Sequence, residues 1–125
     1  MARILIVEDD PAIQSFLVET LRAAGHDMLV AGDGQTGVTL AQEAHPDLVL
    51  MDLQLPVLDG AAATRLLKSD PATGDIRIIA MSAAATFHLD PALLPADGML
   101  EKPFDLDVLL GAIHGQLVTA GVASP

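Results

Sequence analysis

The chain has 125 residues, 51% hydrophobic and 2% aromatic, and its six basic and 17 acidic residues give a formal net charge of −11. The apolar share supports one folded core and excludes a disordered chain, while the negative charge argues against direct nucleic-acid binding. Without cysteine there is no disulfide or cysteine zinc site, and no apolar stretch reaches the roughly 20 residues of a membrane helix. We expect one domain over residues 1–125, with its core over about 3–119, in the cytoplasm and without membrane insertion.

Short apolar runs alternate along the chain with longer segments of helical period. In chain order they predict a strand over 4–7, a helix over 11–24, a strand over 28–31, a helix from about 33 to 44, a strand over 48–51, a helix from 60, strands over 76–81 and 99–100, and a helix from 106. Strands that are apolar throughout are typical of parallel strands covered by helices on both faces. Their alternation with helices predicts right-handed crossovers and a doubly wound α/β sheet.

Capping residues and apolar spacing define the predicted helices more closely. Asp10 suits the N-cap of the first helix and Asp105 that of the last, because an aspartate there accepts a hydrogen bond from the first turn. The third helix is expected to place Ala63, Leu66 and Leu67 on one face. The last helix is expected to bury Leu106, Leu109, Leu110, Ile113 and Leu117.

Charged and polar side chains stand where the predicted strands end. They are Glu8, Asp9 and Asp10 after the first strand, Asp52 after the third, Ser82 after the fourth, and Glu101 and Lys102 after the fifth. Ligands of doubly wound sheets bind outside the carboxyl ends of the strands. Carboxylates gathered there repel one another unless a hard cation neutralises them, and Mg²⁺ suits such oxygen ligands. With Lys102 and Ser82 facing phosphoryl oxygens, the set indicates phosphoryl transfer with Asp52 as the nucleophile.

Five segments, in this order, resemble the response-regulator receiver domain of two-component signalling, most of all its single-domain, chemotaxis-type members. They are ILIVEDD at 4–10, LVLMDLQLP at 48–56, DG at 59–60, MSA at 81–83 and EKPF at 101–104. The resemblance runs from residue 4 to about 117. It implies a flavodoxin-like (βα)5 fold with a five-stranded parallel sheet in the order 2-1-3-4-5, forming a single receiver domain.

The resemblance also implies a role for each residue of the strand-end set. Asp52 would accept a phosphoryl group from the phosphohistidine of a histidine kinase or phosphotransfer protein, and Lys102 and Ser82 would contact the phosphoryl oxygens. Mg²⁺ would be held by Glu8, Asp9, Asp52 and the backbone carbonyl of Gln54.

Further features of the family concern conformation and output. Ser82 and Met99 would form the switch, Gly60 would shape the loop after Asp52, and the peptide bond between Lys102 and Pro103 would be cis. The domain would then signal to a downstream protein target. It would be a phosphoacceptor with intrinsic phosphotransfer and autodephosphorylation activity, and not a conventional enzyme.

Other interpretations stand beside this one. Taken alone, Asp52 could simply end a strand, Lys102 could be a solvated lysine, and Asp10 is assigned mainly to helix capping. A receiver-fold interaction module that is never phosphorylated is the main alternative. A phosphatase is disfavoured because residue 54 is glutamine where such enzymes often carry a second acid. A dinucleotide-binding enzyme is disfavoured because no G-x-G-x-x-G follows the first strand.

The sequence departs from the family's pattern near the end of the chain. Met99 stands where the family usually has an aromatic residue, which predicts a weaker or altered coupling of phosphorylation to that face. Pro91 and Pro95 predict that the fourth helix of the family, between 83 and 98, is short or irregular here. The partner surface that includes this helix is therefore expected to be altered. Gln54 could orient a water at the site, whereas Ala84 could not.

Overall fold

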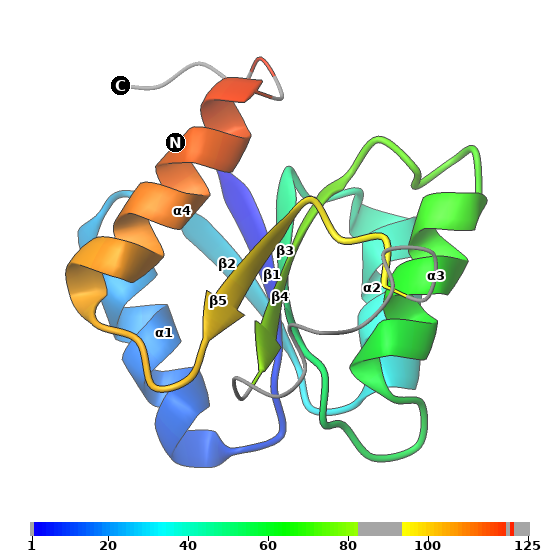
Figure 1. The fold of residues 1–125 in the computed structure, drawn as a ribbon, viewed down its shortest axis with the longest axis horizontal. Helices are drawn as coiled ribbons and strands as arrows, with labels where there is room; N and C mark the ends of the chain where they lie inside the picture. Colours follow the sequence, from blue (N-terminus) through cyan, green and yellow to red (C-terminus); the bar gives the residue numbers. More distant parts are fainter. Residues whose placement is uncertain (1, 83–93, 120, 122–125) are drawn as a thin grey trace.

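The computed structural model describes residues 2–82, 94–119 and 121, and Figure 1 shows how its elements are arranged. They are β1 (Arg3–Val7), α1 (Pro11–Ala23), β2 (Asp27–Ala31), α2 (Gly34–Ala44), β3 (Leu48–Asp52), α3 (Gly60–Ser69), β4 (Arg77–Ser82), β5 (Gly98–Glu101) and α4 (Leu106–Thr119). The strands form one parallel sheet in the order β2-β1-β3-β4-β5, which confirms the predicted fold class. The prediction of a short or irregular fourth helix falls mainly on residues 83–93, outside the described residues.

Helices cover both faces of the sheet, α1 and α4 on one side and α2 and α3 on the other (Figure 1). Successive residues of a strand point to opposite faces, so β1 sends Ile4 and Ile6 to the first layer and Leu5 and Val7 to the second. All four side chains are buried. Because both faces are covered, these strands read as continuous apolar runs and not as alternating ones.

Two expectations about helix faces are wrong. Leu66 is 51% exposed, because the buried arc of α3 runs through Ala63, Thr64 and Leu67 and leaves Leu66 to one side. Leu106 is 47% exposed, although its direction around the axis agrees with the buried stripe of α4. It is the first residue of α4, so its exposure reflects its place at the helix end. None of the helices in the described part of the chain is long and apolar enough to cross a membrane.

Aspartates begin the helices, as the sequence predicts for the first and the last. Asp10, Asp33 and Asp59 are the N-caps of α1, α2 and α3, and each side chain accepts a backbone N–H of the first turn. Asp105 accepts the N–H of Val108 at 2.9 Å. These caps satisfy donors that an α-helix leaves unpaired. The cap at Asp10 starts α1 directly after the charged residues that follow β1, whereas the cap at Asp59 starts α3 at the end of the loop after β3.

A histidine directly before β2, at the amino-terminal end of the strands, gives a pH-dependent prediction. The Nδ1 atom of His26 accepts the N–H of Ala2 at 3.1 Å, and burial lowers the pKa of His26. The folded state therefore favours the neutral ring, and stability falls as pH drops from above the unfolded pKa through the folded one. Between pH 7.5 and 5.5, urea denaturation should show a larger loss of unfolding free energy for the wild type than for His26→Gln. Equal slopes for the wild type and His26→Gln would contradict the assignment.

Candidate functional site

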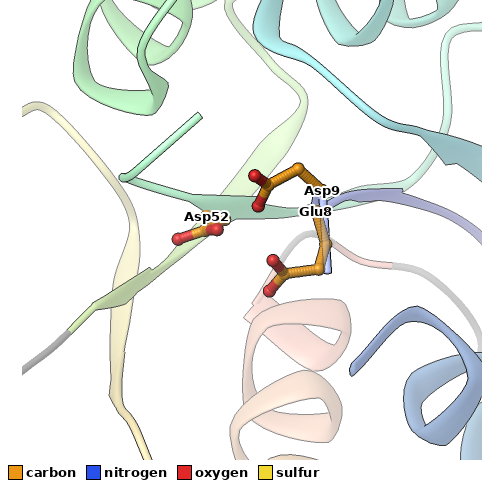
Figure 2. A group of neighbouring side chains, drawn as sticks. All are labelled: Glu8, Asp9 and Asp52. Atoms are coloured by element: carbon orange, nitrogen blue, oxygen red, sulfur yellow. The ribbon is translucent and has the colours of Figure 1, made fainter. Parts of the chain in front are cut away.

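Three carboxylates meet at the carboxyl edge of the sheet. Glu8 and Asp9 follow β1, and Asp52 is the last residue of β3, the central strand next to β1. Carboxylate oxygens of the three residues lie within 4.8 Å of one another, and Figure 2 shows them around a common space. Glu8 is 1% exposed and Asp52 4% exposed, whereas Asp9 is exposed. The parallel register of β1 and β3 thus brings together residues 44 positions apart.

Lys102 supplies the positive charge of this cluster. Its Nζ lies 2.8 Å from Oε1 of Glu8 and 3.4 Å from Oδ1 of Asp52. The backbone places it there, because its N–H donates to the carbonyl of Ser82 at 2.7 Å, one step beyond the β4–β5 pairing. The peptide bond from Lys102 to Pro103 is cis, as the resemblance implied. The cluster thus holds three carboxylates and one ammonium, which pairs with Glu8 and Asp52, so it keeps a negative excess.

Glu8 and its partner Lys102 have shifted pKa values. Burial raises the pKa of Glu8, and the neighbouring Asp52 raises it further, against the lowering effect of the Lys102 hydrogen bond. Burial alone would lower the pKa of Lys102, but its hydrogen bond to Glu8 and the charges of Asp52 and Glu8 outweigh burial and raise it. Lys102 therefore stays an ammonium at neutral pH, and the uncompensated carboxylates favour a further cation.

The loop after Asp52 is held tightly against the strand end. The N–H of Gln54 donates to Oδ1 of Asp52 at 3.1 Å, and the N–H of Gly60 donates to the carbonyl of Leu53 at 3.3 Å. A Cβ on Gly60 would lie only 1.9 Å from the carbonyl oxygen of Asp52. Glycine at 60 is therefore required by a close approach of two backbone segments.

The other residues singled out from the sequence lie around the cluster and not within it. Ser82 is buried at the end of β4, where it pairs in register with Glu101. Met99 is 37% exposed on β5, opposite Ala80 in register. Asp10 turns its carboxylate to the N-terminus of α1 and gives only its backbone N–H to the site, at 3.3 Å from Oε2 of Glu8.

One contact at the site was missed by the sequence reasoning. The side-chain amide of Gln14 on α1 donates to the backbone carbonyl of Glu8. Its place on the first helix, four residues after the N-cap Asp10, was the only available signal. Spacing on a helix gives the side of the helix, but not the hydrogen-bond partner.

The donor set suits a hard divalent cation. Carboxylate oxygens from Glu8, Asp9 and Asp52 are close enough to share one ion, and the exposed side of Asp9 leaves room for water ligands. Mg²⁺ is bound by one or two carboxylates while it keeps several waters. The negative excess and the all-oxygen chemistry of the cluster therefore fit Mg²⁺.

The ion pairs of Lys102 lead to a stability prediction. Replacing Lys102 by Met leaves Glu8 and Asp52 buried without their ammonium, so without metal we expect the unfolding free energy to fall by about 2 kcal/mol. Mg²⁺ should reduce this loss, because removing the ammonium increases the uncompensated negative charge and the variant should bind the cation more tightly than the wild type. Urea denaturation with EDTA and with Mg²⁺ measures both effects. A loss of the same size in both conditions would contradict tighter Mg²⁺ binding by the variant.

Comparison with known families gives a match over most of the chain. The sequence model of the response regulator receiver domain matches residues 4–114. Protein PilH of Pseudomonas aeruginosa is 40% identical over 119 residues, covering 94% of this chain and 98% of PilH. The DNA-binding dual master transcriptional regulator RpaA of Synechocystis is 37% identical over 119 residues, covering 94% of this chain. This chain spans about half the length of RpaA (49%) and of the MtrA relatives (50% in Mycolicibacterium smegmatis).

Solved structures agree with the same assignment. The receiver domain of a sensor histidine kinase from Pseudomonas aeruginosa, crystallised with a magnesium ion coordinated in its active site cleft, superposes with a TM-score of 0.81 at 31% identity. The match covers 96% of this chain and 98% of that one. The chemotaxis protein CheY4 of Vibrio cholerae superposes with a TM-score of 0.84 at 27% identity, covering 94% and 99% of the two chains.

Proposed function

Because this chain belongs to the response regulator receiver family, we propose that it accepts a phosphoryl group on Asp52 from a histidine kinase or phosphotransfer protein and then signals to a protein target. The observation that carries the proposal is the strand-end cluster: three carboxylates within 4.8 Å and one ammonium at 2.8 and 3.4 Å from two of them. Phosphoryl transfer needs little covalent chemistry beyond positioning and charge neutralisation, and this cluster offers both.

In the proposed reaction, a carboxylate oxygen of Asp52 attacks the phosphorus of a phosphohistidine. A new oxygen–phosphorus bond forms while the nitrogen–phosphorus bond breaks, and the histidine nitrogen keeps the electron pair of that bond. The product is an acyl phosphate on Asp52. Asp52 suits this role because it is held at the strand end, with one carboxylate oxygen fixed by the N–H of Gln54 at 3.1 Å.

The surrounding residues have distinct proposed roles. Glu8, Asp9, Asp52 and the backbone carbonyl of Gln54 would hold Mg²⁺. The ion supplies charge neutralisation for the phosphoryl oxygens. Lys102, already directed at Asp52, pairs with a phosphoryl oxygen once the group is in place. Ser82 hydrogen-bonds another phosphoryl oxygen, and its movement together with Met99 changes the face presented by β5.

The proposed partners follow from this chemistry. The phosphodonor is a protein phosphohistidine, and the output is a contact with a protein target, with no direct nucleic-acid contact by this acidic domain. We propose that the core over about 3–119 acts as one receiver domain with intrinsic phosphotransfer and autodephosphorylation activity. We propose the same phosphotransfer activity for the protein as a whole.

A small-molecule phosphodonor tests the proposed function directly. The purified chain is incubated with acetyl phosphate and either Mg²⁺ or EDTA, and its intact mass is recorded. We expect one adduct of about 80 Da with Mg²⁺ and none with EDTA, and borohydride trapping followed by peptide mapping should place it on Asp52. A folded wild type that forms no adduct and does not bind beryllofluoride would instead favour an interaction module that is never phosphorylated.

A further inference from the structure

Asp9 is the exposed carboxylate of the acidic cluster, and within the described part of the chain no other group holds its side chain in place. Within the described residues, the side chain of Asp9 makes no hydrogen bond or ion pair, whereas Glu8 and Asp52 are both buried and both bonded. Asp9 nevertheless places a carboxylate oxygen within 4.8 Å of those of its two neighbours (Figure 2). Its direction must therefore be set by the backbone on either side of it.

Each peptide unit beside Asp9 is fixed by a different side chain. The unit after Asp9 is held through the N–H of Asp10, which donates to Oε2 of Glu8 at 3.3 Å. The unit before Asp9 is held through the carbonyl of Glu8, which accepts from the side-chain amide of Gln14. Fixing both peptide planes around a residue fixes the direction of its Cα–Cβ bond. Two side chains, Glu8 and Gln14, thus orient Asp9.

Gln14 is well placed to keep this contact. It lies in α1, half-buried, and its own backbone N–H donates to the carbonyl of Asp10 at 2.9 Å. Gln14 therefore contacts the turn on both sides of Asp9. Its backbone N–H bonds the carbonyl of Asp10, and its side-chain amide bonds the carbonyl of Glu8. The strand hydrogen bond from the N–H of Glu8 to Ala31, at 3.0 Å, fixes the near end of the same turn.

We propose that Gln14 is a positioning residue of the metal site, which orients Asp9 for Mg²⁺ by holding the carbonyl of Glu8. The inference rests on the proposed function and adds a residue that does not touch the metal. Groups behind metal ligands commonly change metal affinity by about 10- to 100-fold when they are removed. Gln14 supports a ligand through the backbone and not through the ligand's side chain, so we expect the lower end of that range.

The test replaces Gln14 by Met, which keeps length and helix propensity but cannot donate to a carbonyl. Gln42→Met is the control for the chemical change, because Gln42 is an exposed helical glutamine of α2 and has no hydrogen bond to the site. Mg²⁺ affinity is measured by calorimetric titration of each protein. We expect Gln14→Met to weaken Mg²⁺ binding about tenfold and Gln42→Met to leave it unchanged.

Two further measurements separate positioning from general stability. Labelling of Gln14→Met by acetyl phosphate should reach half of its maximum at about tenfold more Mg²⁺ than the wild type needs, because the substitution acts on metal affinity while Asp52 and Lys102 are untouched. In EDTA, the amide ¹⁵N chemical shifts of Gln14→Met should differ from those of the wild type at Asp9 and Asp10 and should equal them across α2 and α3. A merely structural role would lower the melting temperature and leave the Mg²⁺ affinity as in the wild type. Gln14→Asn, whose amide is too short to reach the carbonyl of Glu8, should match Gln14→Met and serves if the latter does not fold.

The outcomes distinguish the two proposals. Wild-type Mg²⁺ affinity in both Gln14 variants, with normal labelling of Asp52, would overturn the role of Gln14 and leave the proposed function in place. A wild type that binds no Mg²⁺ and forms no adduct would overturn both.

Discussion

Replacing Asp52 by Asn is expected to abolish the Mg²⁺-dependent phosphoryl adduct while the protein stays folded. The amide lacks the nucleophilic carboxylate. The remaining carboxylates, Glu8 and Asp9, follow β1, so neither occupies the position of Asp52 at the end of β3. The fold should tolerate the change, because the Asn oxygen can still accept the N–H of Gln54 and a repulsive charge beside Glu8 is removed. Intact mass after incubation with acetyl phosphate checks the prediction, and circular dichroism checks the fold.

Asp59→Asn provides a matched control for this experiment. Asp59 lies in the same loop region, is exposed, and accepts the N–H of Ala62 at 2.8 Å as the N-cap of α3. Asparagine caps helices about as well as aspartate, so stability should change little. The adduct should form at the wild-type level. An adduct that persists in Asp52→Asn would mean that another side chain is the acceptor.

Gly60→Ala is expected to destabilise the protein by about 3 kcal/mol and to reduce labelling of Asp52. The new methyl group would lie 1.9 Å from the carbonyl oxygen of Asp52 and 2.7 Å from the Cα of Leu53, so backbone must move. The segment that moves carries the phosphoacceptor and the Gln54 N–H that holds it. Urea denaturation measures the loss of stability, and acetyl phosphate labelling at saturating Mg²⁺ measures the effect on the site.

Gly111→Ala makes the same chemical change where the structure leaves room for it. Gly111 lies inside α4, and nothing lies within 4 Å of a Cβ built there. Alanine is favoured over glycine in a helix interior by about 1 kcal/mol, so this variant should be more stable than the wild type. Opposite signs for the two substitutions would support the close approach at Gly60. A neutral effect at Gly60 would show that the loop after β3 can relax.

The sequence alone was enough for the order of the elements and the identity of the strand-end residues. The runs 4–7 and 48–51 are apolar throughout because both faces of the sheet are covered, so their pattern predicts buried parallel strands. Strand ends face one edge of such a sheet, which is why Glu8, Asp9 and Asp52 could be expected together. The helix caps Asp10 and Asp105 could likewise be predicted from local sequence, since an N-cap bonds only the first turn of its own helix.

Only the tertiary structure decided how far a pattern extends and which partners meet across the sheet. Leu66 and Leu106 have apolar side chains at helical spacing, yet Leu66 lies beside the buried arc of α3 and Leu106 lies at the exposed end of α4. The distances from Lys102 to Glu8 and Asp52 arise from strand pairing between residues far apart in the chain, which local propensity does not encode. The same holds for Gln14: its position on α1 follows from the sequence, but its bond to the carbonyl of Glu8 exists because α1 folds back against the end of β1.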